Sequence, residues 1–468
     1  MRKVVRLLHV MPMLFAIWLL NPAAVFAQNS DTEYAEPLAS VLHQIEDRFK
    51  VKIKFTEEQV KGRYVKYASW RFRETLAETF TSVLTPLDLK VNQEKESVYK
   101  LKPYEYFRWN VADGWAKLDG LASAVPDKAS WEDRCKLLRP QLFAALQLSP
   151  LPPKPKSKPI ISNHRVMDGY TIENIALEIM PGLYINGSLY RPQKIKGKIP
   201  VILSPDGHWE QQRYRADCQI RCAMIARMGG MAFSYDLFAW GESLLQFKEE
   251  DHRKSLAQTV QALGAIRILD YLEALPETDP ARVGISGGSG GGSHTVLMTA
   301  LDDRIRLTAP VVSLSSYFYG GCPCESGMPV YSCGRGTNAV ELAAMAAPRP
   351  QLVVSDGKDW TAQFPEHDFA YLKKIYGYYG AAAKVQNVHL PAEGHDFGFS
   401  KRKALYEFLV QQFALNGAKV KDVKGNYDES PVKVEEASQL YVFGEHGEHL
   451  PANAIKGFDE LEKVFTVK

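Results

Sequence analysis

The hydrophobic positions between residues 36 and 103 switch repeatedly between helical and strand-like spacing. One face of a helix is marked first, by Leu38, Val41, Leu42 and Ile45. Residues 51–55 then alternate like a strand with one buried face, and a second helical pattern follows. Residues 87–91 and 98–101 alternate again, which predicts a hairpin. We therefore expect a small α+β domain over residues 28–104.

Beyond residue 104 the pattern becomes that of a larger domain. Residues 104–148 have helical spacing, whereas the proline-rich residues 149–155 predict an extended connector. Short apolar runs then alternate with amphipathic helices, the runs being residues 172–178, 183–190, 201–204, 231–235, 283–285, 308–312, 352–354 and 385–390. This alternation predicts a mostly parallel sheet with helices on both faces. We expect an α/β domain over residues 105–468, with a helical cap at its start and a C-terminal tail that packs back onto it.

The first residues have the three parts of a signal peptide. Arg2, Lys3 and Arg6 make a basic start, an apolar run covers residues 7–20, and Ala27 is a small residue at the expected cut. An uncleaved anchor would need about 20 apolar residues, more than this run offers. We predict that residues 1–27 are removed, that the protein is exported to the periplasm or secreted, and that no membrane span remains.

Charge and cysteine content narrow the possible partners. The formal net charge is +3, and the predicted signal peptide carries three positive charges, so the remainder is near neutral and no nucleic-acid partner is expected. An even number of cysteines in an exported chain permits disulfides, and there are six: Cys135, Cys218, Cys222, Cys322, Cys324 and Cys333. We expect Cys322 or Cys324 to pair with Cys333. A metal site on these cysteines is the alternative, but zinc sites typically bring CxxC pairs and histidines nearby in the sequence. Neither accompanies these cysteines, so we predict no metal, and we expect no cofactor.

One motif has the context of a nucleophile elbow. The strand-like residues 283–285 run into Gly287-x-Ser289-x-Gly291, and a helical pattern follows. α/β-Hydrolases place their catalytic serine on such a strand–turn–helix, where small neighbours let the hydroxyl stand clear of the sheet. A phosphate-binding loop or a plain tight turn is the alternative for the glycines. We predict that Ser289 is the nucleophile.

The partners of Ser289 are predicted from chain order, which in this fold is serine, then acid, then histidine. His395 follows the strand-like residues 385–390 and is the predicted general base. Asp359, in the turn after residues 352–354, is the preferred acid. Asp356 is nearer the strand end and is the first alternative, and Glu325, after an earlier strand, is the second.

The oxyanion hole and the substrate contacts are expected in neighbouring loops. In this fold one oxyanion amide belongs to the residue after the nucleophile, here Gly290, and another to a loop after an earlier strand. That loop contains Gly207 and His208, either of which is a candidate donor. Trp209 and Trp360 lie beside these loops and are expected either to stack on sugar rings or to be ordinary core residues.

Several motifs together resemble a known family. They are the elbow, Asp206-Gly207-His208-Trp209, Asp236-Leu237-Phe238-Ala239-Trp240-Gly241-Glu242-Ser243, Gly321-Cys322-Pro323-Cys324-Glu325-Ser326-Gly327 and Ala347-Pro348-Arg349-Pro350. Over residues 163–415 the chain looks like the bacterial acetyl xylan esterase-like α/β-hydrolases. The resemblance implies an exported serine esterase that removes acetyl groups from plant polysaccharides or oligosaccharides such as xylan. Related enzymes cleave methyl esters of pectin or glucuronoyl units, so this is the first alternative, together with a peptidase or other acyl hydrolase on the same fold.

The domain at residues 28–104 resembles a different family. Its hydrophobic spacing and the turn at residues 60–65 are similar to the short N-terminal domain of secretins and TonB-dependent receptors. This resemblance implies a protein partner in the cell envelope. A plain accessory domain without a partner is the alternative, and a non-catalytic envelope protein is a further alternative for the whole chain.

Overall fold

A computed structural model of the protein describes residues 35–66, 68–84, 87, 89–103, 109–254, 256–318, 322–327 and 329–466. The predicted signal peptide lies outside these residues. The chain divides into two compact units, one ending at Glu105 and the other beginning at Tyr106. Among the described residues, no helix has the length and apolar character that crossing a membrane requires.

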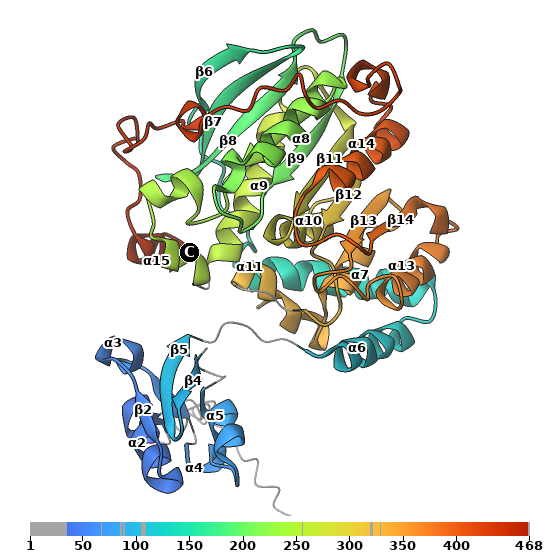
Figure 1. Ribbon diagram of the computed structural model, residues 1–468. Coiled ribbons are helices and arrows are strands. Elements are labelled where there is room, and N and C mark those ends of the chain that lie inside the picture. The colour runs from blue at the N-terminus through green and yellow to red at the C-terminus, as the bar shows by residue number, and fades with distance from the viewer. Residues whose placement is uncertain are drawn as a thin grey trace, which may run out of the picture. The chain divides into compact units, whose positions relative to one another are not determined.

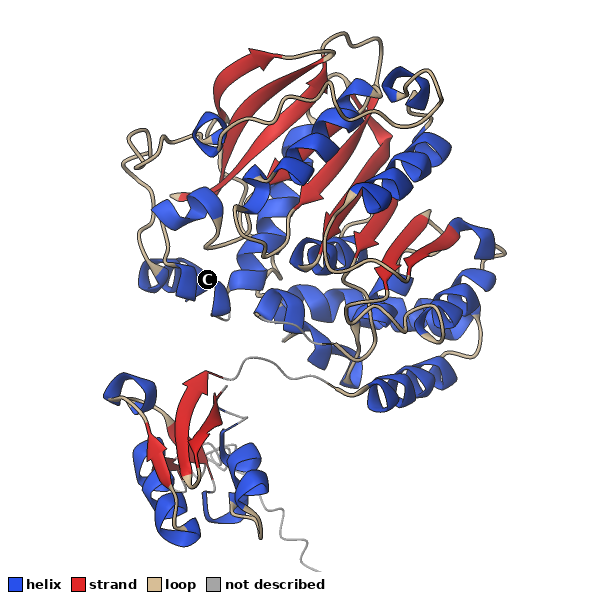
Figure 2. Ribbon diagram, viewed as in Figure 1, coloured by secondary structure: helices blue, strands red, loops and turns tan. Residues whose placement is uncertain are grey.

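The first unit is a small α+β fold, as the hydrophobic spacing predicts (Figures 1 and 2). Its helix α2 (Leu38–Phe49) buries the four predicted apolar positions. The strands form a three-stranded sheet in the order β2-β5-β4 and a separate pair, β1 and β3. β4 and β5 are the predicted antiparallel hairpin. The remaining bounds are β1 (Ala35–Pro37), β2 (Lys52–Lys54), α3 (Glu57–Val60), β3 (Tyr64–Lys66), α4 (Ala68–Arg71), α5 (Leu76–Leu84), β4 (Leu89–Lys95) and β5 (Val98–Pro103).

The second unit is built on a nine-stranded sheet, in the order β14-β13-β12-β11-β9-β10-β8-β7-β6. From β14 to β10 neighbouring strands are parallel, whereas β8, β7 and β6 continue the sheet in antiparallel pairs. The bounds are β6 (Ile160–Val166), β7 (Tyr170–Met180), β8 (Leu183–Pro192), β9 (Ile199–Pro205), β10 (Met231–Tyr235), β11 (Thr278–Gly288), β12 (Leu307–Val311), β13 (Gln351–Asp356) and β14 (Val385–Leu390).

Helices cover both faces of this sheet because successive side chains of a buried strand point to opposite sides. In β9, Val201 and Leu203 pack into one hydrophobic cluster and Ile202 into the other. Helices α9, α10, α12 and α13 contribute to the first cluster, and α8 and α14 to the second. Figure 2 shows helices on both faces of the sheet. The bounds are α8 (Ala216–Arg227), α9 (Ala257–Glu273), α10 (Gly290–Leu301), α11 (Pro323–Ser326), α12 (Ala339–Ala344), α13 (Asp368–Gly377), α14 (Phe399–Phe413) and α15 (Phe458–Thr466). The mostly parallel, doubly covered sheet is therefore confirmed.

The segments at the two ends of this unit also join its core. Helices α6 (Val111–Ala124) and α7 (Lys128–Ala145) place Leu118, Trp131 and Leu138 in the first cluster. The tail reaches the same cluster through Leu461 and Phe465 of α15. A cap function for α6 and α7 stays a prediction. The short helices are η3 (Gln212–Tyr214), η4 (Gly241–Leu245), η5 (Glu249–Arg253), η6 (Val330–Arg335), η7 (Ala382–Lys384), η8 (Gly417–Val420) and η9 (Ala437–Leu440).

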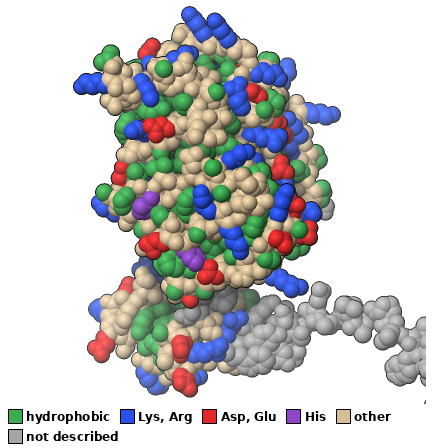
Figure 3. All heavy atoms as spheres, turned by 90° about the vertical axis from the view of Figure 1, so that its right-hand side faces the viewer, with side chains coloured by type: hydrophobic (Ala, Val, Ile, Leu, Met, Phe, Trp, Pro, Cys, Tyr) green, Lys and Arg blue, Asp and Glu red, His purple; other side chains and the backbone are tan. Residues whose placement is uncertain are grey.

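The face of the second unit drawn in Figure 3 carries charges of both signs. Lys and Arg side chains are interspersed there with Asp and Glu side chains. This agrees with the small net charge of the chain, and an unbroken basic field of the kind that attracts nucleic acid is not visible on this face.

Candidate active site

The turn between β11 and α10 holds Ser289 in a conformation that few residues adopt. Its φ is 54° and its ψ is −125°, outside the regions that non-glycine residues favour. The flanking glycines are required by close backbone approach. A Cβ at residue 287 would lie 2.5 Å from the Pro205 carbonyl oxygen, and one at residue 291 would lie 2.6 Å from the same atom. The strained, closely packed turn agrees with the geometry expected of a nucleophile elbow.

The structure brings Ser289, His395 and Asp359 together in one hydrogen-bonded chain. His395 Nε2 lies 2.9 Å from Ser289 Oγ, and His395 Nδ1 lies 2.7 Å from Asp359 Oδ2. The other oxygen of Asp359 accepts from the backbone N–H and the hydroxyl of Thr361, each at 2.6 Å. Burial by itself would raise the pKa of Asp359, but the hydrogen bonds from His395 and Thr361 hold that pKa below its ordinary value. Asp359 therefore faces the histidine as a carboxylate.

The alternative acid, Asp356, faces a buried lysine instead. Its Oδ2 lies 3.4 Å from Lys401 Nζ, and both side chains are fully buried. Burial, followed by the nearby charge of Asp359, raises the pKa of Asp356. The hydroxyl of Thr361 also accepts from the Asp356 N–H at 3.0 Å, which ties the strand end to the turn that carries Asp359.

Lys401 also holds the loop of His395 from both sides. It donates to the carbonyl of Gly394 at 2.5 Å and to Asp396 Oδ1 at 2.8 Å, and it lies 3.5 Å from Glu393 Oε2. We call Asp356, Glu393, Asp396 and Lys401 the lysine clamp. No pattern in the sequence marked Lys401, because a lysine in an amphipathic helix is usually exposed.

The predicted oxyanion loop lies against the nucleophile. A Cβ on Gly207 would lie 2.7 Å from the Gly288 carbonyl oxygen and 2.9 Å from Ser289 Cβ. A Cβ on Gly290 would lie 2.2 Å from His208 Cε1. The structure thus places Gly207, His208 and Gly290 around Ser289, and their roles as amide donors stay predictions.

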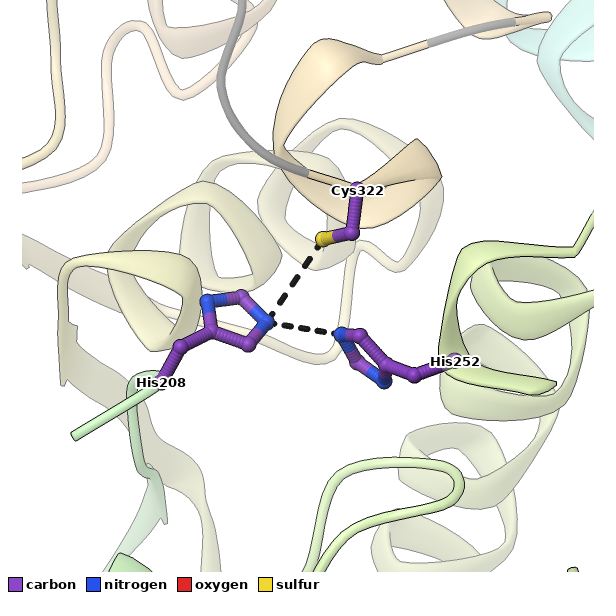
Figure 4. A group of neighbouring side chains, drawn as sticks. All are labelled: His208, His252 and Cys322. Carbon is purple, nitrogen blue, oxygen red and sulfur yellow. Dashed lines mark hydrogen bonds between the residues drawn. The ribbon is translucent and has the colours of Figure 1, made fainter. Parts of the chain in front are cut away.

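The side chain of His208 joins residues from distant parts of the chain (Figure 4). Its Nε2 lies 2.7 Å from His252 Nε2. Its Nδ1 lies 3.1 Å from Glu325 Oε1. Glu325, the second alternative acid, therefore contacts His208 in this structure. His252 is buried on η5, and no motif in the sequence pointed to it.

The two tryptophans expected near the site both lie against His395. The ring centroid of Trp360 is 4.3 Å from that of His395, and the ring of Phe318 stacks on Trp360 with a centroid distance of 4.0 Å. The ring of Trp209 is 5.5 Å from that of His395 and is covered by the guanidinium of Arg215 at 4.3 Å. Both side chains pack around the histidine, and stacking on sugar stays a prediction.

One cysteine prediction is wrong. Cys322 is disulfide-bonded, but Cys333 is a free thiol, so Cys333 is not its partner. Cys333 is instead buried in the first hydrophobic cluster, and that burial raises the pKa of its thiol. Ligand atoms of Cys322, His208 and His252 lie within 4.8 Å of one another. A disulfide sulfur is no thiolate, however, so these three residues do not form a metal site of the usual Cys/His kind.

With this geometry in place, comparison with known proteins identifies the family. A solved structure named Methylesterase BT1017 is 47% identical to this chain, with a TM-score of 0.75, over 94% of this chain and 97% of that one. The chain belongs to the family of this methylesterase. The second unit makes up 363 of the 468 residues of this chain. An alignment that covers 94% of the chain therefore includes most of its first unit as well.

Two sequence comparisons point to glucuronoyl esters, each over a short segment. The family described as "Glucuronyl esterase, fungi" matches residues 247–323. The 4-O-methyl-glucuronoyl methylesterase 1 of Sodiomyces alcalophilus is 43% identical over 70 residues, which are 14% of this chain and 13% of that protein. A glucuronoyl esterase structure from Solibacter usitatus is a more distant likeness, 18% identical with a TM-score of 0.44 over 61% of this chain and 94% of that chain.

These findings establish a carboxylic-ester hydrolase with the α/β-hydrolase fold, and they favour the methyl-ester alternative over acetyl removal. The prediction of an esterase is confirmed, and acetyl xylan specificity gains no support. The resemblance of the first unit to secretin and TonB-receptor domains also gains none and stays a prediction.

Proposed function

We propose that the protein removes methyl groups from uronic acid esters in plant cell-wall polysaccharides, such as pectin or glucuronoyl-bearing chains. The contact of Ser289 Oγ with His395 Nε2, in a chain 47% identical to a methylesterase, is the observation that carries the proposal. The glucuronyl esterase match over residues 247–323 supports a uronic acid as the acyl part.

In the proposed reaction, His395 takes the proton of Ser289 as the oxygen attacks the ester carbonyl carbon. The carbonyl oxygen becomes an oxyanion, which the amides of Gly290 and of Gly207 or His208 stabilise. Collapse of this intermediate breaks the bond to the methoxy oxygen, and His395 returns the proton so that methanol leaves. Water then attacks the acyl-enzyme with His395 again as base, which releases the uronate and restores Ser289.

Asp359 serves this cycle without changing its own protonation. Its carboxylate accepts from His395 Nδ1–H, so the lone pair of Nε2 points toward Ser289. The same carboxylate stabilises the imidazolium that forms at each proton transfer. Its lowered pKa keeps it charged throughout.

The experiment that tests this function measures which product is released. Purified protein is incubated with methyl-esterified pectin, a methyl glucuronate, acetylated xylan and a peptide panel, with Ser289→Ala as the control. We expect methanol from the methyl esters and none from the control. Release of acetate without methanol would overturn the proposal in favour of the acetyl esterase, and new amines would indicate a peptidase.

We also propose that the protein acts after export and that its first unit binds an envelope protein. The basic and apolar start of the chain supports export, and the separate hydrophobic core of the first unit supports an independent binding role. A pull-down from envelope extract with residues 28–104 tests the second part, with the full chain as reference.

A further inference from the structure

The contacts of His252 determine where its proton lies. Its Nδ1 is 2.5 Å from the carbonyl oxygen of Phe238, an atom that only accepts, so Nδ1 carries a hydrogen. Burial, with help from the neighbouring His208, lowers the pKa of His252 to about 4. His252 is therefore neutral near pH 7, and its Nε2 offers a lone pair.

This arrangement determines the hydrogen bonds of His208 in turn (Figure 4). Its Nε2 lies 2.7 Å from His252 Nε2, which accepts through its lone pair, so His208 Nε2 donates. The sulfur of Cys322, 3.5 Å from the same nitrogen, is in a disulfide and cannot donate, which agrees with this direction. On the other side of the ring, Nδ1 faces the Glu325 carboxyl group at 3.1 Å. Acceptors thus face both ring nitrogens.

The ring held in this way lies directly against the predicted oxyanion hole. A Cβ at residue 290 would be 2.2 Å from His208 Cε1 and 2.5 Å from Nδ1, so only glycine leaves room for the ring. The ring of Trp240 makes a T-shaped contact with the His208 ring, with a centroid distance of 5.8 Å, and supports it from another side. Gly290 therefore packs directly against a ring that is itself held by hydrogen bonds.

We propose that His208 is an imidazolium whose two N–H groups are held by His252 and Glu325, and that its charge and position organise the oxyanion hole. This inference rests on the proposed ester hydrolysis. Because both N–H groups are already engaged, His208 donates no proton to substrate and acts as a positioning residue. The ester carbonyl is neutral before attack and its oxygen is negative afterwards, so a fixed positive charge nearby stabilises the transition state more than the bound substrate.

The kinetic test removes the charge of Glu325 and keeps its shape. We expect Glu325→Gln to lower kcat by about 30-fold and to change KM by less than about threefold, a loss below that of an oxyanion donor itself. Glu250→Gln is the matched control, since Glu250 is an exposed carboxylate on the same short helix as His252, and it should retain full activity. A small chromogenic ester is the substrate, so the result does not depend on which natural ester is cleaved.

A spectroscopic test examines the proton directly and needs no activity. The protein is labelled with ¹⁵N-histidine, and the signals of His208 are those that disappear in His208→Gln. These signals should show two protonated nitrogens in the native protein and one in Glu325→Gln. One unprotonated nitrogen in the native protein would overturn the proposal, as would an unchanged kcat in Glu325→Gln. Elemental analysis completes the test. If the native protein holds one metal ion per chain, and His252→Gln loses both this ion and activity, then a metal and not a shared proton joins the two histidines, and the proposal is overturned.

Discussion

The two sides of Ser289 are assembled from very different parts of the chain. On the base side, Asp359, His395 and the lysine clamp all lie between residues 356 and 401, at the end of β13, in the loops after β13 and β14, and on α14. On the oxyanion side, His208, His252 and Glu325 come from three separate segments. The base side forms where adjacent parallel strands end together, whereas the oxyanion side forms only when distant loops pack.

The charges of the two sides differ as well. The buried amine of Lys401 lies near three carboxylates and holds the histidine loop. Asp356 is buried, Glu393 is partly exposed and Asp396 is exposed. His208 faces one carboxylate and one neutral histidine. We therefore expect substitutions on the base side to lower kcat most and substitutions on the oxyanion side to lower it less.

The largest effect is expected from the nucleophile and its base. Ser289→Ala or His395→Ala should lower kcat by about 10⁴-fold or more, because members of such a triad act as one unit. Circular dichroism and melting curves should match those of the native protein. Activity above about a tenth of the native value in Ser289→Ala would assign the nucleophile elsewhere.

The next comparison separates the two aspartates. Asp359→Asn should reduce kcat by about 10³-fold, because an amide can hold His395 in the wrong tautomer. Asp356→Asn should change stability more than rate, since Asp356 contacts Lys401 and not the histidine. Kinetics and melting measured on both variants decide the assignment, and the reverse pattern would make Asp356 the acid.

A third change tests the lysine clamp. Lys401→Met removes a fully buried charge and leaves Asp356 without its partner, which should lower the free energy of unfolding by about 3–5 kcal/mol. Turnover should fall about tenfold as the His395 loop loosens. Adding Asp356→Asn should recover part of the stability, as measured by denaturant unfolding, and no recovery would mean that the pair is not coupled.

As the pH falls, the stability contributed by His252 on the oxyanion side should be lost before that contributed by Asp359 on the base side. The pKa of His252 is lowered to about 4, so the unfolded chain binds this proton from about pH 6.5 and the folded protein does not. The resulting stability is complete above about pH 6.5 and is lost as the pH falls from there to about 4, where the folded protein binds the proton as well. His252→Gln should flatten this part of the melting temperature profile, whereas Asp359, with its lowered pKa, should lose its contribution only at lower pH.

The smallest effect on chemistry is expected from the first unit. A protein beginning at Tyr104 lacks that unit and retains all of the predicted catalytic residues, so it should hydrolyse a small ester within about twofold of the native rate. Any loss should appear on polymeric substrate or in envelope pull-downs. A soluble, folded and inactive shortened protein would show that the first unit contributes to the active site.

The sequence by itself determined the features that depend on neighbouring residues. The helical face of Leu38 to Ile45, the alternation of strands with helices, and the elbow at Ser289 are local patterns. His395 and Asp359 were predicted from chain order, because parallel strands that are neighbours in the sheet end at one edge. The structure places both residues beside Ser289.

Only the tertiary structure decided which polar groups meet across long separations. Nothing local indicates that Asp356 faces Lys401, that Glu325 faces His208, or that Cys333 stays a free thiol. Each of these outcomes depends on which loops the packed sheet brings together and on the cost of burying a charge without a partner. The oxyanion side of the site was therefore the part that required the fold, because its residues share no local pattern and meet only after the core has formed.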